Sequence, residues 1–290
     1  MNNKVSPVSK EGKQISVKRA LELFEKPCET ERVKDFDVFS VKNVNHHLSI
    51  FFEDLTRKKI KNSFSRDQII TQTVKYADEL DFVINKVFER LFEWFGLYYP
   101  EASLKIESVE KFGKVLKRGV DKETVSKVLG ISDYSMGGIF EENDVKELES
   151  NVAMFNCLLG ERDRVKKYIE KLMRKMAPNT SIVATPVLGA KLISAANGLE
   201  NLARKPSSTI QVMGAEKALF RHLTTGAKSP KHGLLLQHPL MNKVNRKNRG
   251  KMARSIANKI SIAVKIDFYD KGVVKHDLLK FLNARAKSLK

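Results

Sequence analysis

An apolar seam precedes Pro100 and predicts a long helix that ends by that proline. Apolar or small side chains recur there at alternating spacings of three and four residues, the repeat of about 3.5 residues that is typical of a coiled coil. The seam consists of Ile70, Thr73, Ala77, Leu80, Ile84, Val87, Leu91 and Trp94. Such a seam packs against another helix, but its spacing does not tell whether that helix belongs to the same chain.

A second seam follows and predicts a second long helix. Its apolar positions are Val145, Leu148, Val152, Phe155 and Leu159, then Ile169, Leu172 and Met176. Arg162 and Lys166 interrupt the repeat. Between the seams, residues 107–129 form a shorter helical region punctuated by glycines. The simplest arrangement is a long antiparallel coiled-coil hairpin with a broken insert at its tip, packed either inside the chain's own bundle or against a partner or second copy.

The two ends of the chain differ from this hairpin. Residues 1–63 carry short mixed patterns: a helix at 16–25, an alternating strand-like stretch at 35–38 and an element at 48–55. After Pro178, small residues lie among Leu and Ile, which lets helices approach closely. We therefore predict a mainly α protein with a small α/β or irregular N-terminal piece at 1–63, a coiled-coil domain at 64–176 and an all-α globular domain at 177–290.

Positive charge is concentrated in the second half of the chain. Residues 1–160 hold 25 Lys and Arg against 26 Asp and Glu, and residues 161–290 hold 28 against 8, which gives formal charges of −1 and +20. A domain with that charge repels itself, so we expect a polyanionic partner, and nucleic acid is the leading candidate. An anionic membrane surface is the alternative, which the spread of the basic residues disfavours.

The last long helical stretch has two faces. The apolar face comprises Ala253, Ile256, Ile260 and Ala263, and the polar face comprises Lys247, Lys251, Arg254 and Asn258. We expect the first face to pack and the second to contact phosphates, although a merely solvated helix face has the same pattern.

Catalytic, metal-binding and membrane-spanning patterns are weak. The chain contains neither a P-loop nor a dinucleotide-binding glycine motif. Its six histidines lack the spacing of a helical zinc site, and residues 177–290 hold only five carboxylates for acid–base chemistry or Mg²⁺. No apolar run approaches the roughly 18 residues of a membrane span, and the N-terminus lacks a secretory apolar stretch. Cys28 and Cys157 stand far apart, so we expect two reduced thiols.

Three runs in the basic half resemble the signature of the Nop-domain family. They are Gly214 to Leu223 (GAEKALFRHL), Ser229 to Gly233 (SPKHG) and Gln237 to Pro239 (QHP). Residues 182–202, 207–212 and 249–254 support the resemblance, and residues 89–101 resemble the family's coiled-coil helix and its end. The resemblance covers the chain from about Arg66 to the C-terminus.

This resemblance implies a scaffold of the archaeal box C/D ribonucleoprotein, the particle that guides 2′-O-methylation of RNA. In that family the Nop domain binds a kink-turn guide RNA together with the small kink-turn-binding protein, and the coiled coil pairs two copies of the scaffold. An N-terminal domain holds fibrillarin, the S-adenosylmethionine-dependent methyltransferase. We therefore expect a non-catalytic homodimer without a cofactor of its own, with S-adenosylmethionine on the fibrillarin partner.

Carried over by position, the resemblance implies two sets of functional residues. The RNA and partner surface comprises Lys217, Arg221, Lys231, His232, Gln237, His238, Lys247, Lys251 and Arg254. The self-association surface comprises Ala77, Leu80, Ile84, Val87, Leu91 and Trp94. Lys and Arg neutralise phosphates, while Gln237 and a neutral His238 can hydrogen-bond to or stack on an exposed base. We expect at least one of Leu219 and Phe220 to be a core residue, and His222 and His232 have an alternative role as hydrogen-bonded structural residues.

The segment before the coil departs from the family pattern. It has only about 65 residues, roughly half the usual fibrillarin-binding domain, so residues 1–63 are expected to form a reduced version of that domain. The chain also lacks the lysine-rich tail of eukaryotic relatives, which favours an archaeal, cytoplasmic setting; a eukaryotic protein would be nucleolar. The alternatives are a spliceosomal-type Nop-domain protein and a generic dimeric basic protein that binds nucleic acid without structural preference.

Overall fold

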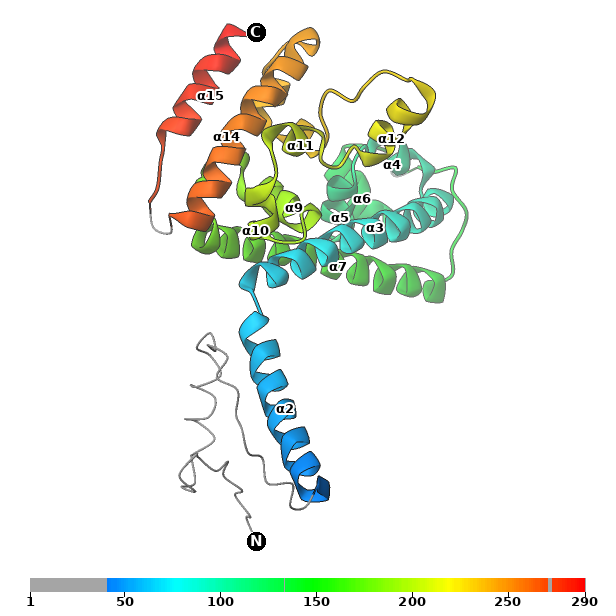
Figure 1. The fold of residues 1–290 in the computed structure, drawn as a ribbon. Helices are drawn as coiled ribbons and strands as arrows, with labels where there is room; N and C mark the ends of the chain where they lie inside the picture. Colours follow the sequence, from blue (N-terminus) through cyan, green and yellow to red (C-terminus); the bar gives the residue numbers. More distant parts are fainter. Residues whose placement is uncertain (1–40, 133, 271–272, 290) are drawn as a thin grey trace, which may run out of the picture. The chain divides into compact units, whose positions relative to one another are not determined.

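The computed structural model describes residues 41–132, 134–270 and 273–289, and every regular element among them is helical (Figure 1). The expectation of a mainly α protein is confirmed. The chain divides into two compact units, Met1–Ser65 and Arg66–Lys290. The predicted helix at 16–25 and strand at 35–38 lie outside the described residues.

The described part of the first unit is one helix, α2 (Val41–Ser63). It contains the short element that the sequence predicts at 48–55 and extends well beyond it on both sides. Ile50, Phe52 and Ile60 are exposed on it, whereas Phe51 and Leu55 are half-buried. This helix therefore presents apolar side chains to its surroundings.

The predicted antiparallel hairpin is formed by α3 (Arg66–Tyr98) and α7 (Glu142–Met176), which lie side by side in Figure 1. Ile84 and Leu91 of α3 share one buried cluster with Leu148 and Phe155 of α7. The two seams thus pack on each other within one chain, which decides the alternative that their spacing leaves open.

Helix α7 continues without a break through Arg162, where the apolar repeat is interrupted. The Arg162 side chain is only 13% exposed, and its Nη1 lies 3.2 Å from Glu110 Oε1 and 4.0 Å from Asp81 Oδ1. A guanidinium is costly to bury unless it is paired, and these two carboxylates supply the partners. Nearby Val165 is buried and continues the apolar contact.

The insert at the tip of the hairpin consists of α4 (Pro100–Lys105), α5 (Val109–Leu116) and α6 (Lys122–Leu129). Its core is aromatic, because the Phe112 ring centroid lies 5.9 Å from that of Phe95 and 5.8 Å from that of Phe155. A Cβ atom on Gly113 would lie 2.5 Å from Leu159 Cδ1. Glycine at this position therefore allows α5 to approach α7 closely.

Residues 177–290 form a domain of short helices around one long helix. Its elements are α8 (Pro178–Ala184), α9 (Pro186–Ala195), α10 (Leu199–Arg204), α11 (Ser207–Val212), α12 (Glu216–Thr225), η1 (Leu234–Gln237), α13 (Pro239–Asn242), η2 (Arg246–Asn248), α14 (Arg249–Tyr269) and α15 (Asp277–Ser288). Helices α8, α10, α11 and α15 pack on α14. The predicted apolar face of α14, from Ala253 to Ala263, is buried as expected. A Cβ atom on Gly189 would lie 2.9 Å from Met173 Cε, so the small residues of α9 allow it to approach α7 closely.

The hairpin and the basic domain share one core. Ile70 of α3 and Ile169 of α7 belong to the same buried cluster as Ile260 of α14. In the first turn of α3, the Asp67 carboxylate accepts a hydrogen bond of 2.8 Å from the Leu199 N–H at the start of α10. The second compact unit therefore begins at Arg66 and continues past residue 176, where the sequence predicts a domain boundary.

Candidate nucleic-acid interface

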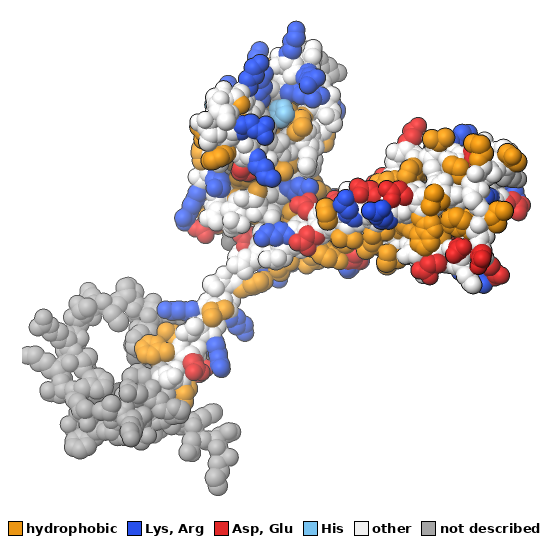
Figure 2. Space-filling model, turned by 90° about the vertical axis from the view of Figure 1, so that its right-hand side faces the viewer, with side chains coloured by type: hydrophobic (Ala, Val, Ile, Leu, Met, Phe, Trp, Pro, Cys, Tyr) orange, Lys and Arg blue, Asp and Glu red, His pale blue; other side chains and the backbone are white. Residues whose placement is uncertain are grey.

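A row of cations lies exposed at the start of α14. Lys251 and Arg254 are exposed on its first turns, and Lys247 is exposed in η2 just before them, whereas Ala253 and Ile256 are buried on the opposite side. Figure 2 shows Lys and Arg side chains gathered over the lobe that the basic domain forms. Such a row can neutralise successive phosphates of a nucleic-acid backbone.

Lys231 is held beside this row. The ideal Cβ position on Gly250, in the first turn of α14, lies 3.4 to 3.8 Å from the Cδ, Cβ and Cγ atoms of Lys231. The Lys231 carbonyl accepts a hydrogen bond of 2.8 Å from Gln211 Nε2, and the Gln211 carbonyl accepts one of 3.0 Å from the Gly233 N–H. The fold thereby places Lys231 beside the start of α14, about 20 residues further along the sequence.

Helix α12 carries Lys217 and Arg221 and has no buried residue. Both cations are exposed, and so are Phe220 and Leu223, at 69% and 74% of their surfaces. The expectation that Leu219 or Phe220 is a core residue is wrong, because Leu219 is only half-buried and Phe220 points to the outside. The exposed Phe220 and Leu223 are candidate contact residues that the sequence analysis missed; their only signal was their position among cations on one short helix.

The position of α12 depends on its two flanking glycines. Gly214 has φ +83°, and a Cβ atom there would lie 2.5 Å from Leu234 Cγ, so only glycine fits this turn. The Glu216 carboxylate accepts a hydrogen bond of 2.7 Å from the Gly214 N–H. Gly226, with φ +67°, ends the helix in the left-handed conformation. These turns hold α12 at the surface without burying any of its side chains.

His238 is not part of the exposed surface, so its assignment as an RNA or partner contact is wrong. Its side chain is 3% exposed, its Nε2 lies 2.9 Å from the Val183 carbonyl, and its Nδ1 accepts a hydrogen bond of 3.1 Å from the Leu240 N–H. This pattern requires a neutral ring with the proton on Nε2. Burial lowers the pKa of His238 from its ordinary value of 6.5, partly opposed by the hydrogen bond to Val183. The residue caps α13 and joins it to α8.

The other polar candidates of this region differ in exposure. Gln237 is exposed at the end of η1, whereas His232 is half-buried. His222, an alternative structural residue, has its Nδ1 in hydrogen-bond contact with the Ala227 carbonyl beyond the end of α12. Gln237 is therefore accessible to a ligand, and His222 has the structural role that the sequence left open for it.

The six predicted self-association residues lie along the internal seam of the hairpin. Ala77, Leu80, Ile84 and Leu91 are buried within the chain, and Val87 and Trp94 are half-buried against the same core. The buried four cannot contact a second copy while the hairpin is folded, so assigning them to a surface is wrong. The sequence spacing missed this because a seam that packs internally has the same period as one that dimerises.

Two negative findings concern the described residues. No group of three or more His, Cys, Asp and Glu side chains there is placed to hold a metal ion. No helix in the same ranges is long and apolar enough to span a membrane.

These features define a class of protein: a mainly α chain, helical throughout its described elements, in which a coiled-coil hairpin carries a compact basic domain with exposed cations and an exposed helix. A family model described as "snoRNA binding domain, fibrillarin", the Nop family, matches residues 76–288. The chain belongs to the Nop family.

Several curated relatives are similar to this chain. An uncharacterized NOP5 family protein of Methanocaldococcus jannaschii is 38% identical over 252 residues, covering 82% of this chain and 61% of the relative. Nucleolar protein 56 of Caenorhabditis elegans is 32% identical over 256 residues, covering 79% of this chain and 52% of the relative. Nucleolar protein 58 of Schizosaccharomyces pombe is 32% identical over 228 residues, covering 73% and 45%. The chain thus spans about half of the length of the relatives it matches.

A solved structure shares the fold. A chain in a crystal structure of a fibrillarin/Nop5p complex is 23% identical, with a TM-score of 0.50, covering 97% of this chain and 96% of that chain. This likeness extends over almost the whole length of both chains.

Proposed function

We propose that this chain is the RNA-binding scaffold of a box C/D ribonucleoprotein that guides 2′-O-methylation, and that its basic domain recognises kink-turn RNA together with the kink-turn-binding protein. The observation that carries this proposal is helix α12, where Lys217 and Arg221 are exposed beside Phe220 and Leu223. Phosphates account for the two cations but not for two large apolar side chains in water. A composite surface of RNA and protein accounts for both.

Fibrillarin is the second partner in this proposal, and the chain itself is not the catalyst. The family description names fibrillarin, and the solved structure with the same fold comes from a fibrillarin/Nop5p complex. We assign the methyl-transfer chemistry and its S-adenosylmethionine to fibrillarin, and no cofactor to this chain. The setting would be the cytoplasm of an archaeon or, for a eukaryotic chain, the nucleolus.

A second copy of the chain is the third partner, and we place its contact at the tip of the hairpin rather than on the seam. Leu97, Leu104, Met136 and Ile139 are all more than two-thirds exposed there. Figure 2 shows hydrophobic side chains gathered over the tip of the hairpin, which is the lobe on the right of the view. A homodimer would remove such a patch from water, which stabilises association in proportion to the apolar area buried.

Met136 and Ile139 of the tip patch lie in a loop that hydrogen bonds tie to α3 and α4, which carry Leu97 and Leu104. Glu101 accepts hydrogen bonds of 2.8 Å from the Met136 N–H and from the Ser135 hydroxyl, and the Gly138 N–H donates one of 2.8 Å to the Leu97 carbonyl. The bond from Met136 is the main cause that lowers the pKa of Glu101. The loop is therefore held in place before any partner binds, which reduces the entropy cost of association.

Binding of the full chain to a box C/D kink-turn RNA tests the proposed function, with and without the kink-turn-binding protein and at two salt concentrations. We expect tight binding only when that protein is present. Salt dependence alone does not decide, because phosphate neutralisation weakens with salt for any basic protein. Equal binding without the protein, or to any duplex, would contradict the proposal and leave a generic basic nucleic-acid-binding protein.

A further inference from the structure

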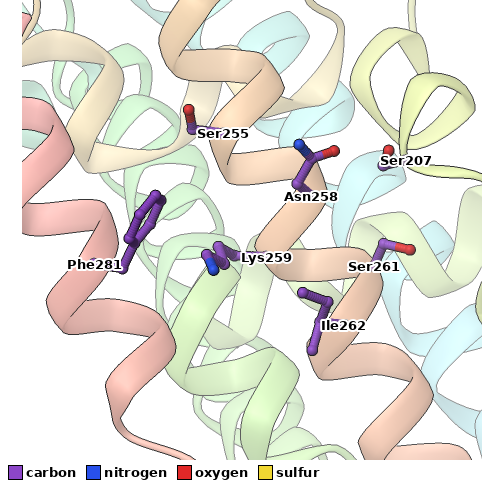
Figure 3. A pocket seen from close by; sticks show the side chains of 7 residues that line it. All are labelled: Ser207, Ser255, Asn258, Lys259, Ser261, Ile262 and Phe281. Atoms are coloured by element: carbon purple, nitrogen blue, oxygen red, sulfur yellow. The ribbon is translucent and has the colours of Figure 1, made fainter.

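An open groove of about 470 Å³ lies on α14, beyond the cation row and away from α12. Its lining residues are Ser207, Ser255, Asn258, Lys259, Ser261, Ile262 and Phe281. Figure 3 shows that α14 forms its floor, with Phe281 projecting from α15 on one side and Ser207 standing on the other. The volume is within the roughly 300 to 1,000 Å³ of pockets that hold small ligands or parts of larger ones.

The side chains that line the groove suit a ligand that is anionic and partly aromatic. The Lys259 ammonium lies 4.1 Å from the centroid of the Phe281 ring, which orders the cation inside the groove. Phe281 is still 49% exposed, so part of its ring is open to a ligand. The seven lining residues include no carboxylate, and Asn258 with the serine hydroxyls supplies hydrogen-bond donors and acceptors.

The groove continues the candidate phosphate-binding row along the same helix. Lys251, Ser255, Asn258 and Ile262 follow one another at spacings of four, three and four residues, so they share one face of α14. The rise of about 1.5 Å per residue places Lys259 roughly 12 Å along the helix axis from Lys251. A strand whose phosphates contact the start of α14 can therefore reach the groove within a few nucleotides.

We propose that this groove binds an unpaired nucleotide of the RNA strand that leaves the structured region, with its base against Phe281 and its phosphate on Lys259. The inference rests on the proposed RNA-binding function and adds a separate subsite to it. Single-stranded RNA presents splayed bases, and proteins bind them by stacking on aromatic side chains and hydrogen-bonding to their edges. Asn258 and the serine hydroxyls are placed to bind the base edge and the ribose 2′-hydroxyl.

The test compares two RNAs in the complex of the full chain with the kink-turn-binding protein. One is a blunt kink-turn RNA, and the other carries single-stranded extensions at both ends. We expect the extensions to tighten binding about tenfold, which is the order of one base–aromatic stack. The variant Phe281→Leu, which keeps apolar bulk but removes the ring, should lose most of this gain and leave blunt-RNA affinity unchanged, and Phe281→Trp should retain the gain.

Lys259 is tested through salt dependence. Lys259→Ala should reduce the salt slope of binding by about 0.7 for the extended RNA and not for the blunt RNA. Lys114→Ala, which removes an exposed lysine of α5 in the hairpin insert, is the matched control and should leave the difference between the two RNAs unchanged.

Three results would overturn the proposed groove: no gain from the extensions, a gain that survives both Phe281→Leu and Lys259→Ala, or an equal loss for blunt RNA. A single-stranded oligonucleotide titrated into the chain alone, with the same variants, separates this inference from the proposed function. Weaker oligonucleotide binding by Phe281→Leu would support the groove even if the kink-turn-binding protein made no difference. Oligonucleotide binding unchanged by both variants would overturn the groove while leaving composite kink-turn recognition intact.

Discussion

The Asp267 carboxylate accepts two hydrogen bonds from Thr180, one of 2.8 Å from its backbone N–H and one of 2.7 Å from its hydroxyl, across 87 residues of sequence. Asn179 donates two more, from its N–H at 3.0 Å and from its Nδ2 at 2.8 Å. The Asn179 side chain also donates to the Val273 carbonyl and accepts from the Lys275 N–H. One buried carboxylate therefore joins α14 to the start of α8 and, through Asn179, to the segment that leads into α15.

We expect Asp267→Ala to lower the free energy of unfolding by about 3 kcal/mol, because buried donors would lose their charged acceptor. Urea denaturation of the full chain measures this change. Asp270→Ala, which removes an exposed carboxylate three residues away, is the control and should be neutral. A loss below about 1 kcal/mol for Asp267→Ala would mean that water replaces the carboxylate.

His238 makes a second stability prediction, for its dependence on pH. Burial holds its pKa in the folded chain below the ordinary 6.5. Below pH 6.5 the unfolded chain therefore takes up a proton that the folded ring does not, so this contribution is complete above pH 6.5 and declines as the pH falls. Urea midpoints measured from about pH 8 to pH 5 should decline, and His238→Gln should reduce the decline. An equal effect of His276→Gln, at an exposed position, would contradict the assignment.

Substitutions on the seam and at the tip should have different effects. Ile84→Glu places a charge at a site that is 1% exposed, so we expect a loss of at least about 4 kcal/mol or complete unfolding. Ile139→Glu changes a fully exposed residue of the tip patch and should leave stability unchanged while weakening self-association. For both variants, analytical ultracentrifugation measures self-association and urea denaturation measures the free energy of unfolding. A folded, monomeric Ile84→Glu protein would instead place the self-association surface on the seam.

Charge reversal at the start of α14 should weaken RNA binding without unfolding the chain. Lys251 and Arg254 are exposed, so Lys251→Glu with Arg254→Glu removes phosphate contacts and no core contact. We expect the affinity for kink-turn RNA to fall at least roughly tenfold and the salt slope to fall by about one per lost contact. The control is Lys114→Glu, at an exposed lysine of α5 in the hairpin insert. Unchanged affinity in the double variant would remove this face from the interface.

Substitutions on α12 should weaken the contact with the kink-turn-binding protein. Phe220→Ser or Leu223→Ser should weaken binding to the complex of RNA and kink-turn-binding protein roughly tenfold, because each removes an exposed apolar side chain from the proposed protein contact. Binding to RNA without the partner should not change, and isothermal titration calorimetry measures both affinities. Val274→Ser, at an exposed apolar site outside α12, is the control. Equal losses with and without the partner would assign the two side chains to RNA contact.

Local periodicity predicted the long helices α3, α7 and α14 because their apolar stripes depend only on nearby residues. The spacing of Ile84 and Leu91 predicted the first arm of the hairpin, and the buried face of α14 from Ala253 to Ala263 is as expected. The spacing could not identify what the seam packs against. Arg162 shows the same limit, since its partners Glu110 and Asp81 come from segments far away in the sequence.

The exposure of the candidate interface was predicted in part. Lys251 and Arg254 are exposed as expected, because a helix face opposite a buried stripe must face outward. His238 was misplaced because its partners, Val183 and Leu240, come from two different helices, and nothing in a short motif reveals such burial. Phe220 was misplaced in the opposite sense, because an apolar side chain is usually buried and only the isolation of α12 leaves it exposed.

The amino-acid order alone therefore carries the helical class of the protein, the two seams, the asymmetry of charge and the Nop-family motifs, since these depend on residue type and short-range spacing. The three-dimensional packing carries the rest. It places the two seams against each other, buries His238, leaves α12 without a buried side chain and positions Lys259 beside Phe281 to form a groove. Contacts between distant segments decide burial, and burial decides which side chains of a motif can meet a partner.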